Sequence, residues 1–337
     1  MCLPACWLPL TAFLIACGWG VTGLSAQAPG YSGYSAPYSP PPAPPAQGSG
    51  PTVKVGGYIQ ARETWRDDSK LTATLNRARI SAEGSLTAGF SYRIMAEYES
   101  GGNASTAASV SLRDAYVRWT RGDFSIVAGQ YKTPFSPEYI TSITMVETAD
   151  RSTVVDTLAT KRDIGVMGLY SYRGYVTVAA GIFNGEGQNR IVNVDSSSLV
   201  VTRIAVRPMG IVSLGTNIAA YAGDSTRYGF DADVEYRGAA LKAEYLWQDH
   251  HIDAPVDQGW YIQGTYRVLP WVQLVLKQEK FERDALSLSR RVVATTGGVN
   301  VYFAGDRIRL LANYVSRRIG TPGKRTSSLI TQGQVRF

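Results

Sequence analysis

The strongest constraint on the fold is a hydropathy period of two that runs from Val53 to the last residue. Segment 230–237 reads FDADVEYR, and segment 307–314 reads RIRLLANY. Successive side chains of a β-strand point to opposite faces, so each such segment has one apolar face and one wet face. The pattern predicts an all-β protein. It does not by itself separate a membrane barrel from a soluble β-sandwich, which would alternate in the same way.

The joints between the alternating segments are alternately tight and long. Tight joints are expected near 87–89, 121–123, 173–174, 208–210, 237–239, 269–270 and 304–306. Longer joints are expected near 66–70, 101–107, 132–162, 185–197, 223–228, 251–257, 283–290 and 320–325. Short turns on one rim and long loops on the other are typical of bacterial outer-membrane barrels, and the segments number about sixteen, an even count.

Composition narrows the alternatives further. The 337 residues are 45% hydrophobic and 18% charged, and no apolar run after Gly20 reaches the ~20 residues that a transmembrane helix needs. A membrane protein of this kind would therefore be a closed sheet, because only helices and closed barrels satisfy every backbone group in lipid. About sixteen strands would enclose a water-filled lumen.

Aromatic residues gather near segment ends, and the chain stops on one. Trp65, Trp119, Trp247, Trp260 and Trp271 are examples, and in a barrel such residues form girdles at the two membrane interfaces. The last twelve residues, TSSLITQGQVRF, alternate and end in Phe337. This ending resembles the closing strand of bacterial outer-membrane barrels, which the assembly machinery reads.

The first 52 residues differ from the rest. No charged residue precedes Lys54, and an apolar stretch from Leu8 to Cys17 is followed by small residues up to Ala26. We interpret 1–26 as a signal peptide, although a start without Lys or Arg is unusual. Lipidation at Cys17 is the alternative. Residues 27–52, rich in Pro, Ser and Tyr, predict a disordered linker, which leaves 53–337 as the barrel domain. All three cysteines precede residue 18, so the mature chain would have none.

Several function classes find little support in the sequence. The formal net charge is +7, but the basic residues are dispersed, which disfavours nucleic acid and suits a lined passage. The two histidines, His250 and His251, offer poor material for a Ser/His/acid enzyme. We find no metal-ligand spacing and no cofactor motif, and we expect no catalysis. A structural or adhesive outer-membrane barrel remains the alternative to transport.

One internal segment interrupts the strand pattern. Residues 132–162 form a long joint after the fifth strand, with apolar residues such as Phe135, Met145 and Leu158 that a fully solvated loop would not favour. A loop of this length and composition is expected to pack on the barrel. We predict that it enters and narrows the lumen; an external lid or an oligomer contact is the alternative.

Several motifs resemble those of the phosphate-selective porins, the O/P family. They are NRARI at 76–80 with Glu83-Gly84, LRDAYV at 112–117, GQYKTPFSPE at 129–138, Thr141-Ser142, Glu147, Arg151, GVM at 165–167 and AGIFNG at 180–185. The match in order and spacing runs from about Val53 to Gly185. The resemblance implies a sixteen-stranded trimeric porin of the Gram-negative outer membrane. Its third extracellular loop would fold inward as the constriction, and small hydrophilic solutes would diffuse through it passively.

The resemblance also implies that lysines and arginines guide anions down the pore, and phosphate-type anions are candidates. Candidate residues on the wet face of their segments, together with Lys132 at the start of the loop, are Arg62, Arg77, Arg79, Arg93, Arg118, Arg203, Arg207, Lys242, Arg267, Lys277, Arg307 and Arg309. Guanidinium groups suit oxyanions, and rings of cations favour anions in pores. Acids such as Glu83, Glu97, Asp114 and Asp231 share that face, so salt bridges within the wall would use the same residues.

Overall fold

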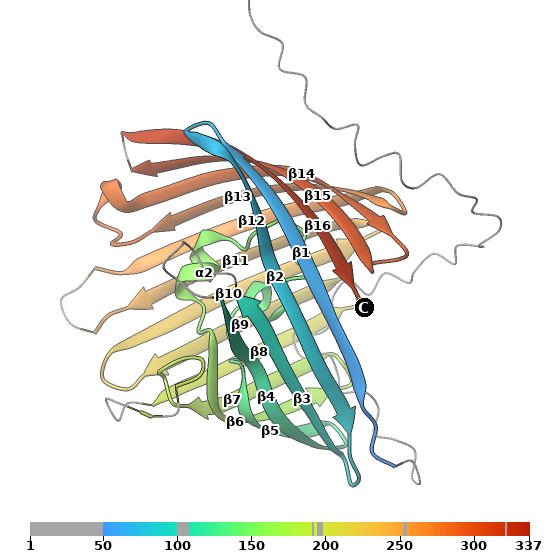
Figure 1. Ribbon diagram of the computed structural model, residues 1–337. Coiled ribbons are helices and arrows are strands. Elements are labelled where there is room, and N and C mark those ends of the chain that lie inside the picture. The colour runs from blue at the N-terminus through green and yellow to red at the C-terminus, as the bar shows by residue number, and fades with distance from the viewer. Residues whose placement is uncertain (1–49, 100–107, 191, 194–197, 252–254, 321) are drawn as a thin grey trace, which may run out of the picture. The chain divides into compact units, whose positions relative to one another are not determined.

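The computed structural model describes residues 50–99, 108–190, 192–193, 198–251, 255–320 and 322–337 (Figure 1). The predicted signal peptide and all but the last three residues of the predicted linker lie outside these ranges. No helix in the described part has the length and hydropathy of a membrane span.

Sixteen antiparallel strands in these ranges close into a barrel, as the sequence predicts. The strands are β1 (Lys54–Arg66), β2 (Ser69–Ser85), β3 (Phe90–Glu99), β4 (Ser109–Arg121), β5 (Phe124–Lys132), β6 (Arg162–Tyr172), β7 (Val176–Phe183), β8 (Leu199–Met209), β9 (Val212–Tyr221), β10 (Ser225–Tyr236), β11 (Ala239–Asp249), β12 (Asp257–Leu269), β13 (Val272–Glu282), β14 (Arg291–Phe303), β15 (Ile308–Gly320) and β16 (Gly323–Arg336). Each strand pairs with its sequence neighbours, and β1 pairs with β16 from Tyr58↔Arg336 to Arg66↔Ser328, which closes the sheet.

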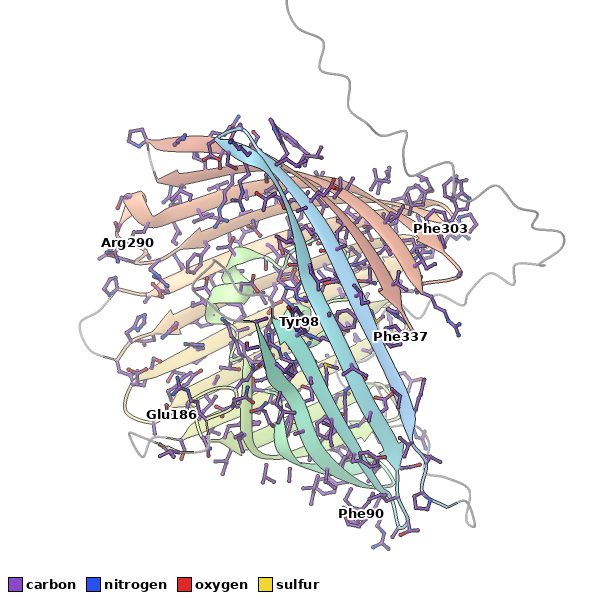
Figure 2. The ribbon with its side chains drawn as sticks, viewed as in Figure 1. Phe90, Tyr98, Glu186, Arg290, Phe303 and Phe337 are labelled. Carbon is purple, nitrogen blue, oxygen red and sulfur yellow. The ribbon has the colours of Figure 1, made fainter. Side chains whose placement is uncertain are left out.

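The burial of side chains follows the period of two, with the apolar face outward. On β16, Leu329 and Val335 are exposed, whereas Gln332 and Gln334 are buried. We call the face with the buried polar residues the inner face. Phe90, Phe303 and Phe337 project from the wall near strand ends (Figure 2). A wall with an exposed apolar outer face and a polar inner face is the arrangement that lipid outside and water inside require.

The predicted rhythm of turns is correct for the tight joints and for five of the long ones. It is wrong for the joints predicted at 66–70, 223–228 and 320–325: only two residues separate β1 from β2, three separate β9 from β10, and two separate β15 from β16. The ladder of β1 and β2 still pairs Arg66 with Ser69. Polar residues at these ends resemble a loop in sequence, but backbone pairing continues beyond the apolar band because it needs no apolar side chains.

The long segment between β5 and β6 contains two short helices, α1 (Pro137–Ile140) and α2 (Thr153–Leu158). The hydroxyl of Ser136 accepts a hydrogen bond from the Tyr139 amide and caps α1. A single 3₁₀ turn, η2 (Leu288–Arg290), precedes β14. We call residues 133–161 the β5–β6 loop.

Candidate functional site

The β5–β6 loop is held by ion pairs to side chains of distant strands. Glu147 accepts hydrogen bonds from the Lys242 ammonium on β11 at 2.5 Å and from the Gln263 amide on β12 at 3.0 Å. Asp150 accepts from the Arg62 guanidinium on β1 at 3.0 and 3.1 Å. The loop therefore contacts strands far from β5 and β6 in the barrel order.

Inner-face side chains also satisfy the backbone of the loop. Arg309 donates to the Val146 carbonyl at 2.8 Å, and Asn300 donates to the Glu147 carbonyl at 2.8 Å. Asn313 accepts from the Ala149 amide at 2.7 Å, and Gln334 donates to the Thr144 carbonyl at 3.1 Å. Buried backbone groups require such partners. The wall from β14 to β16 is thus built to receive residues 144–149 of the loop.

Apolar packing holds the second half of the loop. Val154, Val155 and Leu158 of α2 are buried in a cluster that includes Leu246 on β11 and Phe281 on β13. The Thr153 hydroxyl donates to Glu279 on β13 at 2.7 Å. The apolar residues that make the loop unusual in sequence therefore pack on the inner face of the barrel.

Lys132, the predicted anion ligand at the start of the loop, has its ammonium against three carbonyl oxygens. It donates to Tyr139 at 2.7 Å, Ile140 at 3.0 Å and Thr141 at 2.9 Å. These are carbonyls at and just beyond the C-terminal end of α1. The contacts support a role in holding the loop.

Two acidic groups of the loop have shifted titration. Burial alone would raise the pKa of Glu147, but the adjacent Lys242 ammonium and several hydrogen bonds hold its pKa below the ordinary value. Burial raises the pKa of Glu138, although Lys277 and hydrogen bonds from Ser152 act against the rise. Glu147 is therefore the carboxylate that is most firmly ionised where the loop meets the wall.

A cavity of about 530 Å³ lies between residues 140–145 of the loop and the wall of β1–β6 and β16. Its lining carries seven cationic and two anionic side chains, a formal excess of five positive charges: Lys54, Arg79, Arg93, Arg118, Lys132, Arg162 and Arg336 against Glu83 and Asp114. Both acids are paired. Glu83 accepts from Arg93, and Asp114 accepts from Arg162 at 2.8 Å and lies 3.6 Å from Arg93. The wall of this cavity is therefore electropositive.

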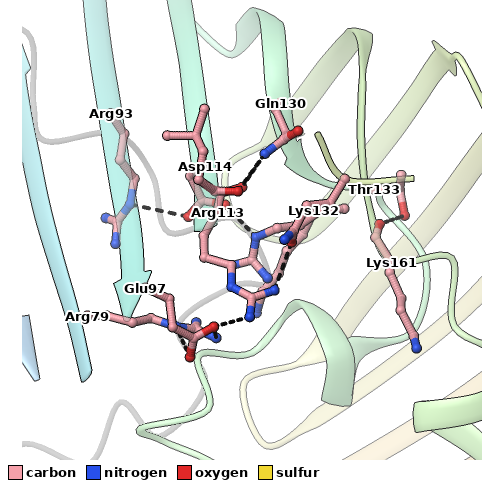
Figure 3. Close-up of polar contacts among 12 residues, drawn as sticks. Arg79, Arg93, Glu97, Arg113, Asp114, Gln130, Lys132, Thr133 and Lys161 are labelled. Carbon is pink, nitrogen blue, oxygen red and sulfur yellow. Dashed lines mark hydrogen bonds and ion pairs between the residues drawn. The ribbon is translucent and has the colours of Figure 1, made fainter. Parts of the chain in front are cut away.

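Each carboxylate at the inner end of the cavity is shared by two guanidinium groups. Glu97 accepts from Arg79 at 2.9 Å and pairs with Arg113 (Figure 3). Asp114 lies between Arg93 and Arg162 in the same way. Two cations for each anion leave a net positive charge, while the acids fix the guanidinium groups in place.

Three cationic side chains of the cavity lack such partners. Lys54, Arg118 and Arg336 make no side-chain hydrogen bond or ion pair within the described ranges. Arg118 is 7% exposed and stacks over the ring of Tyr116, with 5.8 Å between its guanidinium carbon and the ring centroid. Arg118 is thus the predicted candidate whose charge is most available to a solute.

The remaining predicted residues do not gather in this cavity. Arg203 is buried and forms a bidentate pair with Asp231 at 2.6 and 2.9 Å, and Lys277 donates to Thr148 of the loop at 3.1 Å. Arg77 donates to Gln60 at 3.2 Å, and Arg267 donates to the Pro270 carbonyl at 2.8 Å. Such contacts belong to the wall and to the loop attachment.

Two further candidates were placed less well by sequence. Arg307 is exposed in the turn before β15, so it does not share a strand with Arg309. Arg207 lies on β8 and is half-buried, outside the lining of the 530 Å³ cavity. The spacing of two or four residues within a pair did not predict a shared site.

Sequence reasoning missed Arg113 and Arg162. A β-bulge between Met95 and Ala96 on the partner strand leaves Arg113 without an opposite residue, so Arg113 and Asp114 both turn to the inner face. Strict alternation places only one of them there. Arg162 was visible as the last residue of the long joint, and only its pair with Asp114 reveals its place in the cavity.

No group of three or more His, Cys, Asp or Glu residues within the described ranges is arranged to hold a metal ion. The chemistry of the site is that of fixed charges around an open space.

The family model of the phosphate-selective porins O and P matches residues 57–209. Over these residues the chain belongs to that family. The protein is an outer-membrane porin, and its family and fold are those of a channel rather than of an enzyme. No curated protein matches the chain.

Solved structures share the fold of this porin at low identity. The outer membrane channel DcaP of Acinetobacter baumannii aligns with a TM-score of 0.64 and 14% identity over 86% of this chain and 98% of that one. A loop L8 deletion mutant of OmpT, an outer membrane protein of Vibrio cholerae, aligns at 0.62 and 14% over 86% and 100%. An anion-selective porin from Comamonas acidovorans aligns at 0.61 and 13% over 85% and 100%.

Proposed function

We propose that this porin conducts small hydrophilic solutes passively and prefers anions. The observation that carries the preference is the excess of five positive charges on the lining of the 530 Å³ cavity. Fixed cations around a narrow aqueous path lower the energy of an anion and raise that of a cation. The anion-selective porin from Comamonas acidovorans has a barrel of this fold, and phosphate-type anions match the family of phosphate-selective porins.

The proposed path runs between the β5–β6 loop and the wall of β1–β6. The loop starts at β5, and its attachments reach β1 and β11–β16, which supports a course across the lumen. Residues 140–145 would then form one side of the constriction, and the paired guanidinium groups of Arg79, Arg93 and Arg162 the other. Lys54, Arg118 and Arg336 would draw anions toward it from the mouth of the cavity.

The assembly and the export of the chain are part of the same proposal. A trimer form of OmpT from Vibrio cholerae has this fold with 12% identity, and we propose a homotrimer here as well. We also retain the signal peptide at 1–26, with cleavage near Ala26, and the linker at 27–52. A mass spectrum of the mature N-terminus separates this cleavage from lipidation at Cys17.

Planar bilayers test the function directly. Purified protein should give conductance steps in groups of three, and a salt gradient should give a reversal potential that favours chloride over potassium. A potential that favours potassium would overturn the anion preference and leave the porin standing. Folded protein without conductance would instead favour a structural or adhesive role.

A further inference from the structure

The last 31 residues of the chain carry a one-sided charge. Residues 307–337 contain seven basic and no acidic residues: Arg307, Arg309, Arg317, Arg318, Lys324, Arg325 and Arg336. Four of these flank the turn between β15 and β16. The cavity described above uses only Arg336 of the seven, so the charge at this turn needs another explanation.

Arg318 and Arg325 lie side by side on the outer face of the barrel. They are direct cross-strand neighbours in the β15–β16 ladder, and both are exposed. The outer face of β15 is identified by Tyr314, which is 51% exposed and donates or accepts a 3.0 Å hydrogen bond with the Ser327 hydroxyl on β16. Arg318 follows Tyr314 by four residues and Arg325 precedes Ser327 by two, so both keep the outward direction.

Two like charges in this position are unfavourable unless something lies between them. Directly opposite residues have Cβ atoms about 5 Å apart, and like charges there destabilise a sheet. Within the described ranges, neither guanidinium has an acidic partner. Lys280 and Arg291 contrast with them, because both pair with Glu282, at 3.1 and 2.6 Å.

The acid on the neighbouring β1–β2 turn is already engaged. The Asp67 carboxylate accepts from the Ser327 amide at 2.9 Å. The structure thus leaves two adjacent, outward guanidinium groups without an anion.

The height of the pair on the barrel indicates which anion it meets. Tyr314 and Trp65 are exposed on the outer face of β15 and β1 and fit the aromatic girdle at a membrane interface. Four residues of strand place Arg318 about 13 Å further along the strand, toward the rim with the long loops. That rim faces the cell exterior in barrels of this type. The pair therefore lies at the level of the polar headgroups of the outer leaflet.

We propose that Arg318 and Arg325 form a binding site for the phosphate group of an outer-leaflet lipid. Two guanidinium forks match the oxygens of a phosphate, and the phosphate removes the repulsion between them. The outward direction and the position beyond the girdle select a lipid-borne phosphate, since a dissolved anion in the pore cannot reach this face. The site anchors the barrel to its membrane and is independent of the solute path.

Lipid binding by the purified full-length protein tests the site. The probe is bisphosphorylated lipid A, titrated in detergent and followed by native mass spectrometry. Each basic residue near a membrane surface contributes a factor of about five to binding. R318Q and R325Q should each weaken binding about fivefold, and the double variant about thirtyfold. R317Q, on the inner face of the same strand, is the matched control and should change binding less than about twofold.

Further arms keep the proposal open to refutation. R318K/R325K retains both charges and should bind far better than the glutamine double variant, even if the latter folds poorly. Unchanged binding in a folded R318Q/R325Q protein would overturn the site. Equal binding of dephosphorylated lipid A would also overturn it. Equally tight binding of inorganic phosphate at the same two residues would reassign the site to a free anion.

Discussion

Replacement of Arg118 by Gln should reduce the anion preference of the pore by an amount that depends on salt. Arg118 lines the cavity, stacks on Tyr116 and has no acidic partner within the described ranges. An ion about 5 Å from the guanidinium gains or loses about 0.8 kcal/mol in water, and screening at about 0.1 M salt leaves about 0.5 kcal/mol. An anion loses this stabilisation and a cation loses the matching repulsion, so the chloride-to-potassium permeability ratio should fall about fivefold.

Reversal potentials in planar bilayers measure that ratio. At about 1 M salt the Debye length shortens to about 3 Å, and the same substitution should change the ratio less than about twofold. Arg118→Lys keeps the charge and should keep the ratio. Arg307→Gln is the matched control, because Arg307 is exposed in a turn and does not line the cavity. Equal ratios for Arg118→Gln and Arg307→Gln at low salt would refute the reasoning, as would an effect of Arg118→Gln that ignores salt.

Further outcomes follow from the loop attachment and from one close contact in the wall. Lys242→Met leaves Glu147 buried without its cation, which costs about 3–5 kcal/mol, so trypsin should cut the loop faster; in K242M/E147M the cutting should slow again. The folded-state pKa of Glu147 lies below 4.5, so its contribution is complete above that pH and is lost as the pH falls through the lower value; conductance noise should stay constant from about pH 8 to 5 and grow below about pH 4. Gly57→Ala would place a Cβ 2.4 Å from the Arg79 carbonyl and should destabilise the barrel by about 1–3 kcal/mol in heat-modifiable electrophoresis, whereas Gly264→Ala, which faces open space, should not. Equal melting of the two glycine variants would contradict the contact.

The sequence alone determined the architecture of this protein. A period of two, the absence of a long apolar run and the terminal Phe337 predicted a closed antiparallel barrel of about sixteen strands, and these signals are local because alternation fixes which face each side chain takes. The apolar content of residues 133–161 also marked the one loop that packs on the barrel within the described ranges. Three joints were predicted too long, because polar strand ends and loops have the same composition.

Only the tertiary structure decided which charges remain available. Arg203 and Arg118 have the same parity and residue type, yet Arg203 is held by Asp231 two strands away and Arg118 has no acid opposite it in the described part of the chain. A single bulge brings Arg113 to the inner face against the alternation. Charge pairing depends on register between strands that are distant in sequence, and a period of two carries no information about register. Alternation therefore sets the face of each cation, while the closed sheet sets its partner.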